Sequence, residues 1–417
     1  MSASSNLLGP LAGIRVLDLA SMLAGPYAAT LLGDLGADVI KVESFVGDDS
    51  RHLGPRRGSE RTSYLSLNRN KRAISLDLRQ QGARDVFARL AATTDILITN
   101  IREPALSNLG LAYEQVRAVA PRIIWIGVTA FGPDGPYAGR PGIDFLAQGY
   151  AGLLAMNGNP GDEPVRVTVP MIDVMTSELV CSSALAAVIA RGKSGEGQRI
   201  DVSLLDALVH AQAPNIGLWL NGEEDPPRTG NRSQYFAPSG VYPTADGKQV
   251  VITCPSDKFF RNLCEALEIE LFDDPRFVTV ELRQQSEDEL DALLRQRCQC
   301  FTRDELVLRL VAADVLTAPI NSIPEVVLDP QVRHNDMIVD TLHATEGTLR
   351  VTGVPVKLRG TPGSVRLPPP LLGQHTEELL AELGYSPDEI ESLRGEKLTA
   401  TNADIAKAAR TRSRGRS

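Results

Sequence analysis

The sequence contains few of the residues that mark secreted, disulfide-rich or metal-binding proteins. Its 417 residues include only five cysteines and five histidines. The cysteines are odd in number and scattered, which indicates reduced thiols and no disulfide framework. Cys298 and Cys300 form a C-x-C motif without a second pair or a neighbouring histidine, so we expect no metal site.

Long apolar runs and an excess of positive charge are also missing. No stretch approaches the roughly 18 apolar residues that span a bilayer, and the start, MSASSNLLGPLAG, lacks the features of a secretory signal. The net charge of -9 disfavours binding to nucleic acid or an anionic membrane, because both require a basic field. We therefore expect a cytoplasmic protein whose partners include neither.

What the sequence does contain is an alternation of apolar strands and helical segments. With 43% hydrophobic residues, the chain is longer than one compact core usually holds, so two domains are expected. Strands are predicted at IRVLDL, VIKVE, AISLDL, DILITN and IIWIGVTAF, with helical stretches between them. This pattern predicts an α/β fold with an open, mostly parallel, Rossmann-like sheet that binds ligands beyond the carboxyl ends of its strands.

Breaker-rich segments place the domain boundaries. The stretch NGEEDPPRTGNRSQ indicates a boundary near residue 225. We expect a large α/β domain that binds the ligand over 1–225, a smaller α/β domain over 226–328 that contains a strand pair around Asp246, and a return to the large domain over 329–398. Residues 399–417 are basic and poor in apolar side chains, which predicts a disordered tail.

Two features near the N-terminus raise nucleotide-binding hypotheses. Glu43 ends the second strand, where the ribose-binding acid of a nicotinamide dehydrogenase lies, but the first turn, SMLAGPYAA, lacks the G-x-G-x-x-G motif and disfavours that enzyme. The string NRNKR places Arg69, Lys71 and Arg72 before a strand. Either a solvated charge cluster or contacts to a nucleotide phosphate would explain it.

Asp173 stands directly before the apolar segment VMTSELVCSSALAAVIA, which reads as a helix. An aspartate in this position commonly accepts a hydrogen bond from a backbone N–H of the first turn. Spacing alone therefore favours a helix cap.

A longer pattern changes the interpretation of this aspartate. Six segments occur in order over about residues 11–395: LAGIRVLDLASMLAGPYAATLLGDLGADVIKVE, NRNKRAISLDLR, GPDGPYAGRPGIDFLAQ, the Asp173 region, GQRIDVSLLDAL and PLLGQHTEELLAELGYSPDEI. Together they resemble the class III coenzyme A transferases, the family of formyl-CoA:oxalate and carnitine CoA-transferases and of α-methylacyl-CoA racemases. The resemblance implies a homodimer of interlocked chains, with acyl-CoA and a small carboxylic acid as substrates and no permanently bound cofactor.

The resemblance also implies a nucleophile and a set of CoA contacts. Asp173 would attack the thioester and carry aspartyl-anhydride and aspartyl-CoA intermediates. Its place at a helix start is expected to favour the ionised form, with nearby N–H groups holding the oxyanion. The implied CoA-binding residues are Leu23, Ala24, Leu76, Arg79, Asn100, Ile101, Gly142, Ile143 and Asp144, with Arg102 and Arg72 as further phosphate candidates.

Departures from the family pattern narrow the substrate. Leu23 replaces the glutamine of formyl-CoA transferases, Ser44 replaces an arginine, and Asn108 fills a position near the diphosphate that is often arginine. The family's four-glycine lid is also absent, with GNRSQYFAPSG in that neighbourhood. We therefore expect an acid other than oxalate and a short donor such as succinyl-CoA. Arg228 and Arg232 could pair with a second carboxylate of the acid, or could be solvated.

Other activities of the family stay open as alternatives. A racemase carries a histidine before the aspartate of the G-x-D loop, and this chain has Ile143 there, which cannot move a proton. An α-methylacyl-CoA racemase is therefore disfavoured. Intramolecular CoA migration and non-catalytic CoA binding are the remaining alternatives.

Overall fold

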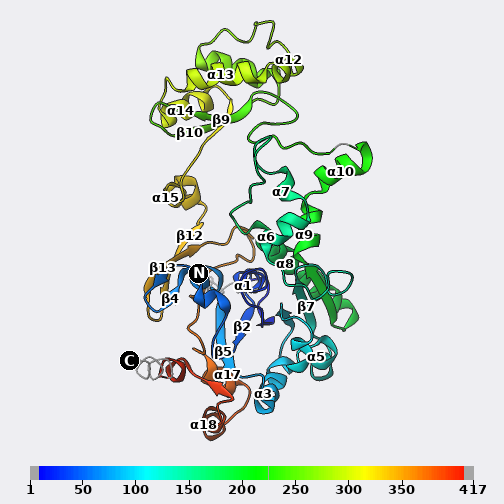
Figure 1. Cartoon of the computed structure of the whole chain (residues 1–417). Helices are drawn as coiled ribbons and strands as arrows, with labels where there is room; N and C mark the ends of the chain where they lie inside the picture. Colours follow the sequence, from blue (N-terminus) through cyan, green and yellow to red (C-terminus); the bar gives the residue numbers. More distant parts are fainter. Residues whose placement is uncertain (1–8, 224, 408–417) are drawn as a thin grey trace, which may run out of the picture. The chain divides into compact units, whose positions relative to one another are not determined.

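The computed structural model describes residues 9–223 and 225–407, and these form two compact units. The first unit contains the described residues up to Ala151, the segment Val169–Ala213 and the residues from Pro330 onward. In Figure 1 it therefore combines blue and cyan elements with orange and red ones. The second unit contains Gly152–Thr168 and Pro214–Asp329.

This division differs from the predicted one at two places. The chain leaves the first unit at residue 214 and not near 225, and residues 152–168 belong to the second unit. Hydrogen bonds explain the second difference. Gly230 donates its N–H to the Gly158 carbonyl at 3.0 Å, and Arg228 donates to the Ala155 carbonyl, so this loop is bonded to the start of the second unit.

A seven-stranded sheet forms the centre of the first unit, in the order β14-β5-β2-β1-β6-β7-β8. All neighbouring pairs are parallel except β14 with β5. The predicted α/β fold with a mostly parallel sheet is thus confirmed. The strands are β1 (Arg15–Asp18), β2 (Asp38–Glu43), β5 (Lys71–Leu76), β6 (Ile96–Thr99), β7 (Ile124–Thr129), β8 (Gln198–Ser203) and β14 (Thr399–Ala400).

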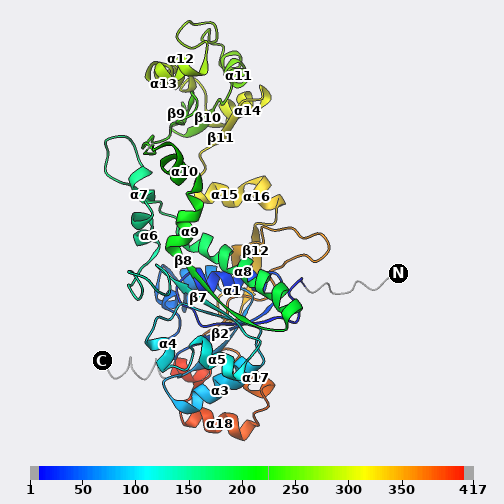
Figure 2. The same cartoon turned by 90° about the vertical axis from the view of Figure 1, so that its right-hand side faces the viewer.

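Helices cover both faces of this sheet, as Figure 2 shows. The central strands β6 and β7 are nearly continuous apolar runs because neither of their faces meets water, whereas the edge strand β8 is largely exposed. Beneath the sheet in that view, buried side chains such as Leu17, Phe87 and Leu380 form one core. The helices there are α3 (Gln81–Ala92), α4 (Ala105–Asn108), α5 (Tyr113–Val119), α17 (Thr376–Glu382) and α18 (Pro387–Gly395).

On the opposite face α1 (Ala24–Asp34) packs against α8 (Met171–Ser194). Small buried residues on both helices, among them Ala28, Ala29, Ala184 and Ala187, allow the close approach. The other elements on this unit are η1 (Asp49–His52), α2 (Thr62–Leu67), α6 (Asp144–Tyr150), α9 (Leu204–Ala211), α16 (Pro330–His334) and the hairpins β3 (Arg56–Arg57) with β4 (Glu60–Arg61) and β12 (Ile338–His343) with β13 (Gly347–Thr352).

The predicted disordered tail is wrong for its first residues. Thr399 and Ala400 form β14 at the edge of the sheet, and both are buried. The Thr399 hydroxyl donates to the Ser75 carbonyl at 2.8 Å, and Arg394 forms an ion pair with Asp404. Edge pairing therefore orders the chain through this segment, and the last part of the predicted tail, 408–417, lies outside the described residues.

The second unit has its own core around a three-stranded antiparallel sheet, β11-β10-β9. β9 (Ser239–Pro243) and β10 (Gln249–Thr253) form the strand pair predicted around Asp246, and β11 (Leu316–Pro319) joins β10. The helices are α7 (Leu153–Met156), α10 (Ala213–Gly222), α11 (Asp257–Leu267), α12 (Val280–Gln285), α13 (Glu287–Cys298), α14 (Arg303–Ala312) and α15 (Ile323–Leu328).

One helix among the described residues, α8, is long and apolar enough to cross a membrane by length and composition. The sequence-based expectation that no segment approaches this length is therefore corrected. The same helix places Ile172, Thr176, Val180 and Ala184 in the interior of the first unit.

Candidate active site

The carboxyl ends of β1 and β6 bring two predicted site segments together. Asn100, directly after β6, donates its side-chain N–H to the Ser21 carbonyl at 2.8 Å and accepts the Ser21 N–H at 3.0 Å. Ser21 belongs to the turn between β1 and α1, which also contains Leu23 and Ala24. The predicted contacts in this turn and at Asn100 and Ile101 therefore lie at one edge of the sheet, as the parallel arrangement requires.

Ser177 connects this turn to the helix that bears Asp173. Its side chain is buried, and its hydroxyl lies 2.8 Å from the Ala24 carbonyl and 2.8 Å from the Asp173 carbonyl. Residues 24 and 173 are therefore joined through one hydroxyl group. The sequence analysis did not single out Ser177, because its only signal is its spacing of one helical turn after Asp173.

Asp144, and not Asp173, caps α8. One carboxylate oxygen of Asp144 accepts the N–H groups of Ile172 and Asp173 at 2.9 and 3.3 Å, and the other accepts from Gln148 at 2.7 Å. The helix begins at Met171, two residues before Asp173. The predicted cap role of Asp173 is wrong, because the cap comes from the start of α6, a contact that local spacing does not reveal.

The Asp173 carboxylate is half-buried and accepts no hydrogen bond from the described part of the chain. Burial, and secondly the charge of Asp144, raises the pKa of Asp173 to about 7. The expectation that the helix start favours the ionised form is therefore wrong. Desolvation and a neighbouring carboxylate outweigh the helix dipole.

The first three backbone N–H groups of α8 already donate hydrogen bonds. Met171 donates to the Val169 carbonyl at 2.7 Å, and Asp144 takes the next two. The expectation that nearby N–H groups hold the oxyanion stays a prediction. An oxyanion formed at Asp173 would need other donors or a displacement of Asp144.

The loop that leads from β7 to Asp144 approaches the sheet closely. A Cβ atom on Gly142 would lie 2.3 Å from that of Ala130, so only glycine fits there. Ile143 beside it is 59% exposed. Arg102 donates to the Gly139 carbonyl at 3.1 Å, which places this arginine against the same loop.

Two other predicted CoA contacts lie at or just beyond the carboxyl end of β5. Leu76 is buried at the end of the strand. Arg79 follows two residues beyond Asp77, with which it forms an ion pair, and its side chain is 81% exposed. Both lie at the carboxyl edge of the sheet, on the far side of β2 from the first turn.

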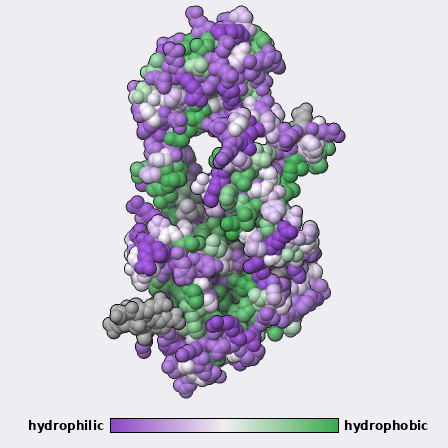
Figure 3. Space-filling view, viewed as in Figure 1, coloured by the Kyte–Doolittle hydropathy of each residue, from purple (hydrophilic) through white to green (hydrophobic). Residues whose placement is uncertain are grey.

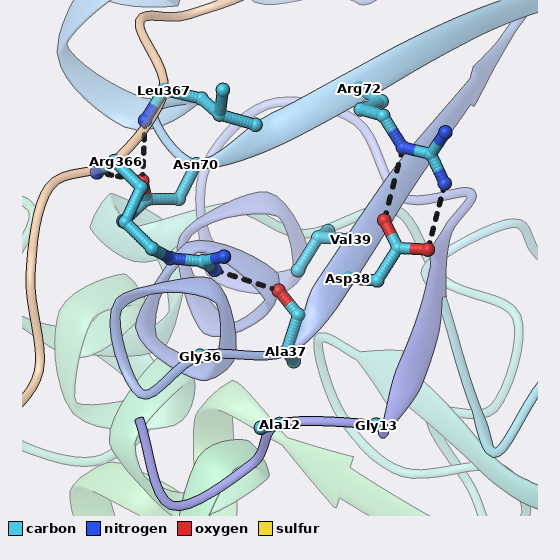
Figure 4. A pocket seen from close by; sticks show the side chains of 10 residues that line it. All are labelled: Ala12, Gly13, Gly36, Ala37, Asp38, Val39, Asn70, Arg72, Arg366 and Leu367. Atoms are coloured by element: carbon cyan, nitrogen blue, oxygen red, sulfur yellow. Dashed lines mark hydrogen bonds and ion pairs between the residues drawn. The ribbon is translucent and has the colours of Figure 1, made fainter. Parts of the chain in front are cut away.

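The structure does not bring Arg72 to this edge. It lies near the start of β5, where ion pairs join it to Asp38, Glu378 and Glu382. The nearby pocket, of about 140 Å³, is lined by Arg72, Asp38, Arg366 and residues before β1 (Figure 4). Strand starts and strand ends lie at opposite edges of a parallel sheet, so the predicted phosphate contact of Arg72 does not share a site with Asp173.

The remaining cations of NRNKR are buried. Arg69 donates to both carboxylate oxygens of Asp34, at 3.0 and 2.6 Å. Lys71 donates to Asp18, Asn68 and the Pro26 carbonyl. Neither a solvated cluster nor a phosphate site describes them, since each cation is neutralised inside the unit.

The two arginines suggested for a second substrate carboxylate are also occupied within the second unit. Arg228 donates to the backbone carbonyls of Ala155 and Asp162. Arg232 forms ion pairs with Asp288 and Glu287. Neither is held as an open anion receptor in this structure. Among the described residues no cluster of three histidine, cysteine or acidic side chains could hold a metal ion.

Comparisons with known proteins indicate the family to which the chain is similar. The model of the CoA-transferase family III matches residues 11–376. A succinyl-CoA:glutarate CoA-transferase from Homo sapiens is 35% identical, over 91% of this chain and 87% of its own. A succinate–glutarate CoA-transferase from Agrobacterium fabrum is 37% identical, over 92% and 98%. The β subunit of a succinyl-CoA–L-malate CoA-transferase from Chloroflexus aurantiacus is 36% identical, over 93% and 98%.

Solved structures agree with the family match. A CAIB/BAIF family protein from Brucella suis superposes with a TM-score of 0.84 at 35% identity, over 90% of this chain and 99% of that one. A protein from M. tuberculosis, solved in an orthorhombic form, gives 0.78 at 29% identity, over 90% and 100%. The chain therefore belongs to the CoA-transferase family III and is a CoA-transferase.

Proposed function

We propose that this enzyme moves CoA from succinyl-CoA to a small dicarboxylic acid, with Asp173 as the covalent acyl acceptor. The observation that carries the proposal is the state of Asp173. It is a half-buried carboxylate with no hydrogen-bond partner in the described part of the chain, beside the turn where CoA contacts are expected. The relatives that transfer CoA from succinyl-CoA to glutarate or malate support the choice of substrates.

The chemistry follows from the carboxylate. An Asp173 oxygen attacks the thioester carbonyl, the C–S bond breaks, and an anhydride and CoA thiolate form. The thiolate then attacks the Asp173 carbonyl of the anhydride, which gives an aspartyl-CoA thioester and releases succinate. The incoming carboxylate repeats the sequence in reverse, through a second anhydride, and leaves as its CoA thioester with Asp173 restored.

The raised pKa of Asp173 suits a nucleophile that has no counterion. Its pKa of about 7 leaves the ionised form accessible near neutral pH, and no counterion has to be displaced before attack. A CoA diphosphate at the carboxyl edge would add negative charge, so the cations there matter. Arg79 and Arg102 are the proposed phosphate contacts, with Leu23, Ala24, Leu76, Asn100, Ile101, Gly142 and Ile143 lining the coenzyme.

We also propose a cytoplasmic homodimer of interlocked chains. All five cysteines are unpaired, which suits a reducing compartment. Figure 3 shows apolar side chains at the surface among the hydrophilic ones, and on α8 Ile189 is 63% exposed. A second chain would cover such positions.

Exchange of label tests the function. Succinyl-CoA incubated with labelled glutarate or malate should give the labelled CoA thioester of that acid. Succinyl-CoA incubated with labelled acetate should give little acetyl-CoA. The Asp173→Ala variant should lose at least ~10³-fold of the transfer rate, as removal of a nucleophile does. A variant that keeps the full rate would refute the role of Asp173, whereas transfer to acetate alone would refute only the dicarboxylate.

A further inference from the structure

A network of four buried charges lies directly beneath the first βα turn. Asp18, Lys41 and Lys71 have fully buried side chains, and that of Asp48 is 1% exposed. Lys41 lies between the two carboxylates, 3.3 Å from Asp18 and 2.7 Å from Asp48, and Lys71 lies 2.8 Å from Asp18. Two cations and two anions thus balance inside the unit, away from water.

The network is hydrogen-bonded to the backbone of the turn at Ala20 and Met22, and to the start of α1 at Pro26. Asp18 accepts the Ala20 N–H at 3.1 Å, and Lys41 donates to the Ala20 carbonyl at 2.9 Å. Asp48 accepts the Met22 N–H at 3.2 Å, and Lys71 donates to the Pro26 carbonyl at 2.6 Å. Asp18, Lys41 and Asp48 therefore contact the turn itself, and Lys71 contacts the first residues of α1 that follow it.

Met22 shows why such support is needed. Its φ angle is 75°, in the left-handed region that costs a residue with a Cβ free energy. Its side chain is 41% exposed, so packing does not force this conformation. The bond from its N–H to Asp48 is the hydrogen bond to the strained residue itself, and the neighbouring Ser21 is held by Asn100 and by Asp49.

Asp48 itself is held firmly. Its Oδ1 also accepts from the N–H and hydroxyl of Ser50, at 2.8 and 2.7 Å, and its own N–H donates to Glu43 at 2.9 Å. Burial would raise the pKa of Asp48, but the charge of Lys41 and these hydrogen bonds bring it well below its usual range. The carboxylate stays ionised, and its position does not depend on the turn that it supports.

We infer that Asp48, set by Lys41, is a positioning residue that holds the Ala20–Ala24 turn in the shape that receives the coenzyme. The inference rests on the proposed function, in which this turn contacts CoA. The Ser177 hydroxyl links the position of this turn to the position of Asp173, because it contacts the backbone carbonyls of Ala24 and Asp173. Asp48 touches no substrate and acts through Met22.

Direct binding of CoA to the full-length protein, measured by titration calorimetry, tests this. Asp48→Asn should raise the Kd for CoA about tenfold, which corresponds to about 1.4 kcal/mol. Asp34→Asn is the matched control, since Asp34 is a buried, ion-paired carboxylate at the other end of α1. It should destabilise the fold and leave the Kd of the folded protein unchanged.

A second pair of variants leaves the buried charges intact. Met22→Gly permits the left-handed turn and should bind CoA like the unaltered protein, whereas Met22→Val opposes it and should raise the Kd about as much as Asp48→Asn. In the Asp48→Asn background, Met22→Gly should recover part of the lost affinity. If Asp48→Asn does not fold, the contrast between glycine and valine at position 22 decides.

Three results would overturn the inference. They are an unchanged Kd in both Asp48→Asn and Met22→Val, an equal change in Asp34→Asn, and no binding of CoA by the unaltered protein. The last would overturn the proposed function as well. CoA binding that weakens as expected, in a protein that transfers nothing between succinyl-CoA and glutarate, would overturn the proposed function and leave the role of Asp48 supported.

Discussion

Two carboxylates of the first unit, Asp34 and Asp173, lie on the two helices that pack together above the sheet. Their hydrogen-bond partners differ. Asp34 is buried and accepts hydrogen bonds from Arg69 and Asn70. Asp173 is half-buried, accepts none from the described residues, and has another carboxylate nearby. A buried charge that serves the fold is paired, because its desolvation is otherwise too costly. A charge left unpaired indicates chemistry.

The largest effect on stability should come from removing Asp34, the paired carboxylate of this comparison. Asp34→Ala leaves the Arg69 guanidinium buried without its counterion, and we expect a loss of about 3–5 kcal/mol in the free energy of unfolding. Denaturant unfolding of the purified protein measures it. A loss below about 1 kcal/mol would show that the ion pair is not what anchors the end of α1.

Asp173, the unpaired carboxylate, predicts a pH dependence of the acylation rate. Acylation by succinyl-CoA requires ionised Asp173, so the single-turnover rate should rise with pH through an inflection near 7. Asp144→Asn keeps a cap acceptor for α8 but removes the neighbouring charge, so the inflection should move to lower pH. Asp85→Asn, on the opposite face of the sheet, should leave it unchanged. An inflection that stays in place in Asp144→Asn would show that burial alone sets the pKa.

The same pKa has a consequence for stability. The pKa of Asp173 rises from 3.8 to about 7 on folding, so the native state binds more protons than the unfolded one between these values. Stability contributed by this group therefore falls as pH rises through that window. Asp173→Asn should stabilise the protein by about 1–2 kcal/mol at pH 8, after allowance for partial exposure, and by nothing at pH 4. Thermal melts at the two pH values compare them, and an Asn variant less stable at pH 8 would contradict the account.

The smallest effect concerns an exposed pair. Arg79 bonds only to Asp77 in the described structure and is mostly in solvent, so Arg79→Gln should leave the unfolding free energy almost unchanged. If it contacts the CoA diphosphate, the KM for succinyl-CoA should nevertheless rise several-fold while kcat stays the same. An unchanged KM would remove Arg79 from the proposed binding site.

Much of the first unit could be predicted from the sequence, for physical reasons. Strands such as ILIT in β6 are continuous apolar runs because a covered parallel sheet buries both faces, and this signal is local. The carboxyl edge follows from the topology, which is why Leu23 and Asn100 were expected near each other. The misassigned start of α8 has a different cause, since its cap, Asp144, comes from 28 residues earlier.

Charge clusters were harder to interpret. The string NRNKR shows three cations in the sequence, but their partners Asp34, Asp18 and Asp38 lie on other elements, so pairing and burial are invisible locally. Arg72 was named as a phosphate candidate although it was predicted just before a strand, and its place near the start of β5 keeps it at the edge opposite the strand carboxyl ends. Three-dimensional pairing, and not residue type, separates the structural charges from Asp173.

Covalent capture tests the central claim most directly. The protein is incubated with succinyl-CoA and hydroxylamine, digested, and the peptide that contains Asp173 is examined by mass spectrometry. We predict a hydroxamate on Asp173 that forms only when succinyl-CoA is present and is absent from the Asp173→Asn variant. An unmodified Asp173 in protein that is transferring CoA, or a hydroxamate on another carboxylate, would contradict the account.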